Sequence, residues 1–168
     1  GAIERSGANA EYHLVDERIV SSMPKTLAFA DAAALPLTSL TAWEMLFDRF
    51  KINSDTKGTL LVIGGAGGVG SIMIQLAKKL TQLKVVATAS RPDTIEWVLK
   101  LGADAVINHR NPLSEELQKT EYKSADYVAS LNQTGQHLKE IEKLLLPKGH
   151  LGVIDDPKTL DIMPFKTK

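Results

Sequence analysis

A glycine-rich segment between residues 59 and 79 constrains the fold of this chain more than any other feature of its sequence. It opens with an apolar run at residues 60–63, short enough to be a strand buried on both faces. Five glycines follow within seven residues, and they contain the motif Gly65-Ala66-Gly67-Gly68-Val69-Gly70. The apolar residues that follow recur with the spacing of one helix face: Val69, Ile72, Met73, Leu76, Ala77 and Leu80. A strand, a glycine turn and a helix in this order predict a dinucleotide-binding turn.

Each glycine of the motif has a separate physical role in such a turn. Gly65 allows a tight exit from the strand, Gly67 lets a pyrophosphate approach the backbone, and Gly70 lets the helix pack close to the sheet. The free N–H groups and the positive end of the helix dipole then face the phosphates. The alternative is a glycine-rich turn that binds nothing, but the strand and helix patterns on either side favour a dinucleotide site.

Length and charge balance exclude several classes of protein. The 168 residues suit one domain with a sizeable core, or one domain and part of another. Twenty basic residues balance twenty acidic ones, so no overall field would attract nucleic acid or an anionic membrane. Without cysteine the chain has no disulfide and no thiolate metal site. The sequence shows no signal peptide and no apolar run of membrane length, and we expect a cytoplasmic protein.

The first 50 residues do not follow the pattern of the glycine-rich segment. Residues 10–15 alternate as a strand does, and residues 18–20 form a second short candidate strand. Pro36 would end or kink a short helix that precedes it. A second helix is predicted from about residue 38 to residue 49. Its core-facing residues would be Leu40, Trp43, Leu46, Phe47 and Phe50.

Beyond residue 80, short apolar strands alternate with helices. The predicted strands cover residues 84–89, 105–107, 127–131 and 151–154. This alternation implies right-handed crossovers and a parallel sheet. We therefore predict a doubly wound, Rossmann-like α/β fold with strand order 3-2-1-4-5, in which a ligand binds at the carboxyl ends of the strands.

Local signals predict the ends of the helices in this half of the chain. Ser90, followed three residues later by Asp93, resembles a capping box. Ser114 would begin a short and mostly exposed helix, and Pro147 with Gly149 would end the last one. That last helix would carry Leu138, Ile141, Leu144 and Leu145.

The residues after the second strand indicate which dinucleotide the site prefers. An NAD-binding protein usually places Asp or Glu about 20 residues beyond the glycine motif, where it accepts hydrogen bonds from the ribose hydroxyls. This chain has Ala89-Ser90-Arg91 there, and its next carboxylate is Asp93. A hydroxyl and a guanidinium suit the 2′-phosphate of NADP, Arg91 through charge-assisted hydrogen bonds. NADP is favoured over NAD, with a helix cap at Ser90 and a solvated cation at Arg91 as the alternatives.

Other candidate ligand or catalytic residues are fewer. His109 and Arg110 follow the third strand and would lie beside the adenosine end of the cofactor, unless they form an ordinary polar loop. His13, His137 and His150 are scattered without a metal-binding spacing. The nucleophile elbow of serine hydrolases is absent from the sequence, as is the tyrosine–lysine pair that short-chain dehydrogenases need.

Four segments, spread in order from residue 33 to residue 149, carry a resemblance to a known family that extends over nearly the whole chain. They are residues 33–43 (AALPLTSLTAW), the turn GGAGGVG, residues 100–104 (KLGAD) and residues 146–149 (LPKG). With these segments in this order, the chain resembles a medium-chain dehydrogenase/reductase of the zinc-free, quinone-oxidoreductase-like branch.

The resemblance implies a function and a chain cut from a longer protein. It implies an NADPH-dependent oxidoreductase that passes hydride to a quinone, an enone or a related carbonyl. Residues 1–25 resemble the end of a separate catalytic domain, and residues 26–155 would be the NADP-binding domain. Residues 156–168 would lead to a missing strand that the family uses in dimerisation. The fragment alone would then be inactive, and the full-length protein would be a homodimer.

The resemblance also assigns roles to single residues. Zinc-dependent relatives place a cysteine ligand near Leu37, and leucine cannot ligate a metal, so the resemblance argues against a catalytic zinc. Thr41 matches a position near the nicotinamide, where its hydroxyl would position the ring or the substrate. The alternative for Thr41 is burial against the next turn of its helix. Asn132 and Ile154 follow the fourth and fifth strands and are expected to face the cofactor.

Two other functions fit parts of the pattern. A non-enzymatic nucleotide-binding module would share the glycine turn, but the isolated first strand and the missing sixth strand argue against a complete module. A methyltransferase can have a similar turn, but it predicts an acidic residue after the second strand, where Ala89-Ser90-Arg91 has none. An oxidoreductase accounts for more of the sequence than either alternative.

Overall fold

The computed structural model describes residues 10–167, which fall into two compact units, Gly1–Ala34 and Leu35–Lys168. In the first unit the described elements are a 3-10 turn, η1 (Glu17–Ile19), and a short helix, α1 (Phe29–Ala33). The strands predicted at residues 10–15 and 18–20 are wrong, because neither segment forms a strand. A strand needs a neighbouring strand for its N–H and C=O groups, and these exposed residues pair with none.

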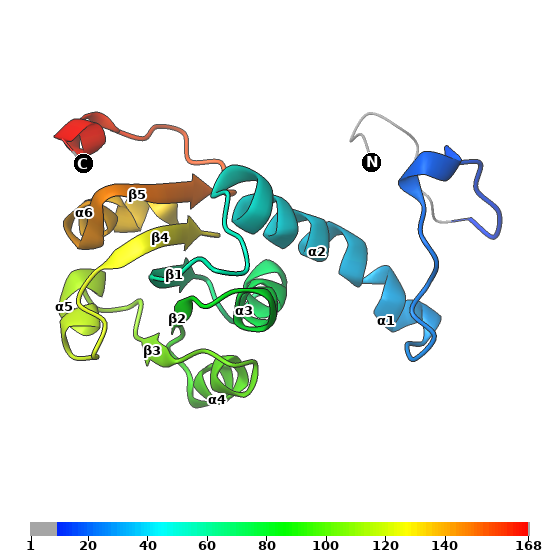
Figure 1. The fold of residues 1–168 in the computed structure, drawn as a ribbon, viewed down its shortest axis with the longest axis horizontal. Coiled ribbons are helices and arrows are strands. Elements are labelled where there is room, and N and C mark those ends of the chain that lie inside the picture. The colour runs from blue at the N-terminus through cyan, green and yellow to red at the C-terminus, as the bar shows by residue number, and fades with distance from the viewer. Residues whose placement is uncertain (1–9, 168) are drawn as a thin grey trace. The chain divides into compact units, whose positions relative to one another are not determined.

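The second unit is built on a parallel sheet, and the described residues give it five strands in the order β3-β2-β1-β4-β5. This confirms the predicted doubly wound, Rossmann-like α/β fold. The central strand is the apolar run that precedes the glycine turn, and it is almost fully buried (Figure 1). The strands are β1 (Thr59–Ile63), β2 (Lys84–Thr88), β3 (Ala105–Ile107), β4 (Ala125–Ser130) and β5 (Leu145–Val153).

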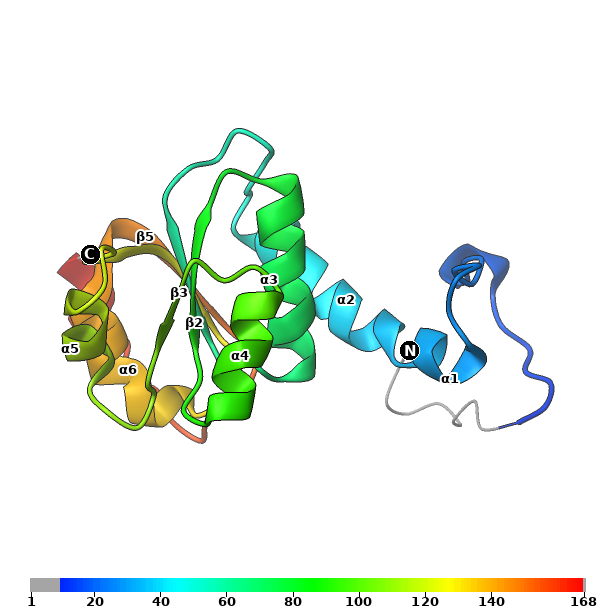
Figure 2. The same cartoon turned by 90° about the horizontal axis from the view of Figure 1, so that it is seen from below.

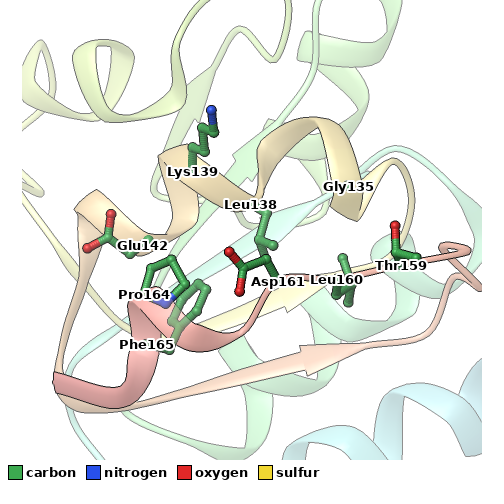
Figure 3. A pocket seen from close by; sticks show the side chains of 9 residues that line it. All are labelled: Gly135, Leu138, Lys139, Glu142, Thr159, Leu160, Asp161, Pro164 and Phe165. Atoms are coloured by element: carbon green, nitrogen blue, oxygen red, sulfur yellow. The ribbon is translucent and has the colours of Figure 1, made fainter.

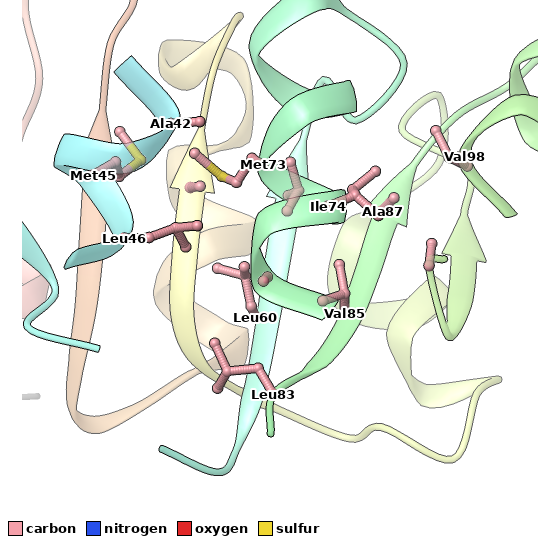
Figure 4. Packing of buried hydrophobic residues seen from close by; sticks show 14 of the residues in the cluster. Ala42, Met45, Leu46, Leu60, Met73, Ile74, Leu83, Val85, Ala87 and Val98 are labelled. Carbon is pink, nitrogen blue, oxygen red and sulfur yellow. The ribbon is translucent and has the colours of Figure 1, made fainter. Parts of the chain in front are cut away.

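Helices cover both faces of this sheet (Figure 2). On one face lie α3 (Gly68–Leu80) and α4 (Pro92–Lys100), and on the other lie α5 (Leu113–Gln118) and α6 (Thr134–Leu144). Each face has its own apolar core. Figure 4 shows the core on the α3 side, where side chains from the helix that precedes β1 and from α3 meet those of β1 and β2.

The helix that precedes β1 begins earlier than predicted and ends at the predicted residue, Arg49. It begins at Leu35, so Pro36 lies in its first turn, where a missing N–H costs nothing. Helix α2 (Leu35–Trp43) continues into a π-helical segment, η2 (Glu44–Arg49). Two of the predicted core residues, Leu40 and Trp43, are exposed, while Leu46 and Phe50 are buried as predicted and Phe47 is partly buried. A strict 3.6-residue period fails here because the π segment rotates the later side chains relative to the earlier ones.

Two other predicted boundaries and one predicted exposure are wrong. The N-cap of α4 is Arg91 and not Ser90, and it pairs with Thr94, whose Oγ1 accepts from Arg91 N at 3.2 Å. Helix α5 has two fully buried leucines, so it is not mostly exposed. Helix α6 ends at Leu144, and Leu145 begins β5, because the chain passes from helix to strand within a single residue there.

The C-terminal segment returns over α6 and ends in a 3-10 turn, η3 (Met163–Thr167). Phe165 from this turn packs against the core on the α5–α6 side of the sheet. Among the described residues no helix is long and apolar enough to cross a membrane.

Candidate dinucleotide-binding site

Several positions of the turn between β1 and α3 accept only glycine. Gly64, just before the predicted motif, has a φ of +85°, the left-handed conformation that releases the chain from the strand. A Cβ on Gly65 would lie 2.8 Å from the Cβ of Ala87 on β2. A Cβ on Gly70 would lie 2.5 Å from the carbonyl oxygen of Gly64. The close approach that we assigned to the helix and the sheet at Gly70 is therefore a contact between the helix and the turn itself.

Helix α3 begins at the turn with an open N-terminus. Its N-cap is Gly67, and no side chain caps this end of the helix. The hydrogen bond from Ser71 N to the Gly67 oxygen, 2.8 Å long, closes the first turn of the helix. The amides of residues 68–70 precede that bond, so they have no partner within the helix. Uncapped amides at the positive end of a thirteen-residue helix suit a phosphate group.

Backbone hydrogen bonds continue the sheet beyond the strand ends and bring the predicted site residues to one edge. Ala89 N donates to Ile107 O at 3.1 Å, so the segments that carry Arg91 and His109 run side by side. Gly64 N donates to Thr88 Oγ1 at 2.9 Å, which ties the glycine turn to β2. Across the sheet, Leu131 N donates to Ile63 O and Ile154 N to Ser130 O. All five strands therefore present their carboxyl ends along one line.

Arg91 lies beside the glycine turn with its guanidinium in solvent. Its side chain is 65% exposed, and its Nε is 3.4 Å from the Oδ1 of Asp93, itself 71% exposed. An ion pair between two exposed groups contributes little free energy. The guanidinium of Arg91 is therefore available to an incoming anion, while Ser90, partly buried, stands one residue nearer to the strand.

His109 lies among positive charges at the end of β3. Partial burial lowers the pKa of its imidazole first, and the positive charges of Arg110 and Arg91 lower this pKa further. Arg91 follows β2, so its effect on this pKa agrees with the pairing of β2 and β3. Asn108, the residue before it, donates its backbone N–H to Glu116 Oε2 on α5, at 3.2 Å.

The two predicted residues on the other side of the turn lie nearby. A Cβ on Gly64 would be 2.9 Å from Asn132 Oδ1, so the amide of Asn132 lies against the turn. Ile154 is 40% exposed and follows β5. Between them lies a buried polar network that the sequence analysis missed. The hydroxyls of Ser130 and Thr134 are 2.7 Å apart, and the Asp155 carboxylate accepts from both the backbone N–H (2.9 Å) and the hydroxyl of Thr134.

Helix α2 passes close to the same turn. A Cβ on Gly68 would lie 3.1 Å from the Cγ2 of Thr38. One turn further along α2 is Thr41, whose hydroxyl donates to the carbonyl oxygen of Leu37 at 2.8 Å. The side chain of Leu37 is 79% exposed. Within the described part of the chain, no three His, Cys, Asp or Glu side chains are grouped so that they could hold a metal ion.

The hollow drawn in Figure 3 lies elsewhere, between α6 and the C-terminal segment. It has a volume of about 250 Å³, and Leu138, Pro164 and Phe165 contribute apolar side chains to it. A second hollow of about 500 Å³ lies between η2 and β5 and includes Arg49 and His150. Neither hollow contains a predicted cofactor residue.

Comparison with protein families supplies the identification. A family model described as zinc-binding dehydrogenase matches residues 68–167, which is more than half of the chain and includes α3 and the four strands after β1. The chain belongs to the zinc-binding dehydrogenase family. This family lies within the medium-chain dehydrogenase/reductase superfamily, as the sequence resemblance implied.

Individual relatives of this family are similar over most of the chain. A zinc-type alcohol dehydrogenase-like protein of Staphylococcus epidermidis is 44% identical over 158 residues, 92% of this chain and 47% of the relative. The crystal structure of a proposed zinc-dependent alcohol dehydrogenase from Rhizobium etli CFN 42 is 53% identical, with a TM-score of 0.93, and covers 99% of this chain and 49% of that one. The chain thus spans about half the length of the relatives it matches.

A more distant relative has been solved with a bound cofactor. The quinone oxidoreductase of Thermus thermophilus, whose structures include a complex with NADPH, is 27% identical with a TM-score of 0.69. The match covers 86% of this chain and 45% of that one. The structural relatives of this chain therefore include proteins that bind NADPH.

Gly64 and Thr88 are two further residues of the site that the sequence analysis missed. Gly64 directly precedes the motif. A glycine at the end of an apolar strand could have indicated a residue with left-handed backbone conformation there. Thr88 is a lone hydroxyl in a strand that is otherwise apolar after its first residue, and it is only 2% exposed. Its hydroxyl oxygen accepts a hydrogen bond from the backbone N–H of Gly64, and the sequence does not reveal that this N–H lies nearby.

Proposed function

We propose that this chain is the cofactor-binding half of an NADPH-dependent oxidoreductase that passes hydride to a quinone, an enone or a related carbonyl. The observation that carries the proposal is the pairing of an uncapped glycine turn with Ser90 and Arg91 beside it. The end of β2 holds a hydroxyl and an available guanidinium where an NAD site would hold a carboxylate. The quinone oxidoreductase relative, solved in complex with NADPH, supports the same cofactor and acceptor class.

The residues of the site fit NADPH. The backbone at Gly67 and the open amides of residues 68–70 would hold the pyrophosphate. Arg91, with Ser90, would hold the 2′-phosphate through charge-assisted hydrogen bonds. Asn132 and Ile154 would lie along the nicotinamide half of the cofactor, since they follow the strands on the other side of β1.

The nicotinamide ring of the bound cofactor would supply the hydride. Thr41 would position this ring or the substrate. Its hydroxyl donates to Leu37 O and keeps its acceptor lone pairs, so it can still accept a hydrogen bond from the N–H of the nicotinamide carboxamide. The network of Ser130, Thr134 and Asp155 would hold the start of α6 in place behind the cofactor.

We further propose that this chain contributes no ligand to a catalytic zinc. Leucine at position 37 cannot bind a metal, and the sequence contains no cysteine. The family's name refers to zinc, but the resemblance places this chain in a zinc-free branch. Metal analysis of the purified chain tests the point, and one equivalent of tightly bound zinc would contradict it.

The domain organisation remains part of the proposal. Residues 1–25 would be the end of a catalytic domain, residues 26–155 the NADP-binding domain, and residues 156–168 a connection to a further strand. The full-length protein would be a cytoplasmic homodimer, and the substrate would bind between its two domains.

Fluorescence titration with NADPH and with NADH tests the cofactor assignment. NADPH is expected to bind more tightly, because only its 2′-phosphate can engage Arg91. Equal affinity for the two cofactors, or tighter binding of NADH, would contradict the assignment. A chain that binds NADPH in the titration, and whose longer gene product reduces no quinone or enone, would instead be the nucleotide-binding module considered above.

A further inference from the structure

His109 and Arg91 form a cluster of cations at the edge of the sheet, together with Arg110. The hydrogen bond from Ala89 N to Ile107 O sets the two loops side by side, and Arg91 and His109 each lie two residues beyond this pair. Arg110 is exposed, while His109 is partly buried. Three groups that carry or can carry a positive charge thus lie at the adjacent ends of β2 and β3, and the charges of Arg91 and Arg110 act on His109.

Two carboxylates lie near this cluster: Glu116 is bonded to groups outside it, and Asp93 is paired with Arg91. Glu116 on α5 accepts from Asn108 N and Asn111 Nδ2, and Lys119 Nζ lies 2.5 Å from its Oε1. Asp93 on α4 is paired with Arg91 itself and is largely in solvent. Among the described groups that affect the pKa of His109, the charges are those of Arg110 and Arg91, and both are positive.

His137, on the first turns of α6, is the other titratable group that faces His109. It is only 7% exposed, and its Nε2 has no hydrogen-bond partner among the described residues. Burial lowers the pKa of His137 first and the charge of His109 lowers it further, whereas Glu140 raises it. Glu140 is itself bonded to Ser114 and Lys143. The pKa of His137 therefore lies below its usual value, and the positive charge of a protonated His109 would lower it further.

We propose that His109 is a proton-linked specificity residue: it is neutral in the free protein and takes up a proton from solvent when the 2′-phosphate of NADPH lies between it and Arg91. The dianionic phosphate supplies the negative charge that this cluster of cations lacks, and a charged imidazole is stabilised beside it. NADH has no such group and leaves His109 neutral. The proposal rests on the NADPH assignment made above.

The direction of the pH dependence follows from the two states of His109. Its pKa is low in the free protein and higher in the NADPH complex, so binding is favoured more as the pH falls from the higher value to the lower one. Each unit of difference between the two corresponds to about a tenfold change in affinity. We expect the preference for NADPH over NADH to increase about threefold to tenfold across this interval.

The phosphate also titrates, with a second pKa of about 6, so a variant must separate the two effects. His109→Gln keeps a hydrogen-bond donor but cannot change its charge. The affinities of the wild-type chain and of this variant for NADPH and NADH are measured between about pH 5.5 and pH 8, an interval that spans the usual pKa of histidine. His150→Gln removes a histidine on β5, away from the cluster, and this control should keep the wild-type pH dependence.

A pH dependence that is steeper for the wild type than for His109→Gln, with NADPH only, supports the proposal. Equal slopes together with a retained preference for NADPH overturn the role of His109 and leave the cofactor assignment intact. No preference for NADPH at any pH overturns both. NMR titration of the wild-type chain is independent of any variant: the pKa of His109 should be higher in the NADPH complex than in the NADH complex, and equal values would contradict the proposal.

Discussion

Gly70 is the glycine of the turn that leaves the least room for a side chain. The nearest atoms to its would-be Cβ are backbone atoms of Gly64 and Gly65, at 2.5–2.7 Å. Backbone atoms cannot rotate away as a flexible side chain can, so the turn would have to open. Gly135 on α6 provides the contrast, since a Cβ there would meet nothing within 4 Å.

We therefore expect Gly70→Ala to lower the free energy of unfolding by about 1–3 kcal/mol and to weaken NADPH binding, because the displaced turn no longer presents its amides correctly. Urea unfolding and NADPH titration measure the two effects. Gly135→Ala is the matched control and should be neutral or slightly stabilising, by up to about 1 kcal/mol. Equal stability of the two variants would show that the turn yields more easily than its contacts imply.

Replacing Arg91 with alanine tests the 2′-phosphate site at a single side chain. A charge-assisted hydrogen bond contributes about 1.5–3 kcal/mol, so NADPH affinity should fall by that amount while NADH affinity stays the same. Lys100→Ala removes an exposed cation at the opposite end of α4 and should leave both affinities unchanged. A parallel loss of NADPH and NADH binding in Arg91→Ala would point to a damaged helix start instead.

At the scale of elements, Asp104 joins α3, β2 and β3 at the edge of the sheet opposite the site. Its carboxylate accepts from Lys78 Nζ at 2.8 Å and from the backbone N–H of Val85 at 2.7 Å. Burial by itself would raise the pKa of Asp104, but these bonds and the charges of Lys78 and Lys84 outweigh it and hold the pKa below its usual value. Asp104 thus links the start of β3 to α3 and to β2.

Asp104→Asn is expected to lower the free energy of unfolding by about 1.5–3 kcal/mol at neutral pH. Because the pKa is lower in the folded than in the unfolded protein, the carboxylate stabilises the fold fully above the unfolded value of about 3.9 and loses this effect as the pH falls through the folded value. Urea unfolding from neutral pH down to about pH 3 should show the difference shrinking. Asp55→Asn, in an exposed turn, is the control, and a difference that did not shrink would contradict the role of the charge.

A helix or strand was predictable where its apolar residues recur with a clear spacing and the residue that begins or ends it is unambiguous. Strand β1, the start of α3 and the end of α4 before Gly102, which has a φ of +109°, are of this kind. The boundary between α6 and β5 was not, because Leu144 and Leu145 continue the helical apolar pattern into the strand. Only the pairing of Leu145 with Ala125 on β4 decides that Leu145 belongs to the sheet.

The chain is only about half as long as the relatives it matches, and this has a consequence for the whole molecule. Substrate would be bound between the cofactor domain and a catalytic domain, so the 168-residue chain should bind NADPH but oxidise it slowly. The rate of NADPH oxidation with a simple quinone acceptor, with and without the chain, measures this. A turnover rate typical of enzymes, of the order of 1–1,000 per second, would show that the catalytic residues are all present in this chain.

The sequence by itself determined the fold class and the strand order, and it predicted a cofactor site at Gly65–Gly70 with Ser90 and Arg91. These follow from local periods and from the rule that parallel strands end at one edge, neither of which needs coordinates. The tertiary structure alone decided neighbours that the sequence did not predict: Thr88 Oγ1 accepts from Gly64 N, and the charge of His109 acts on His137. Such neighbours come from separate βα units, and their approach depends on how the sheet twists and packs rather than on any local pattern.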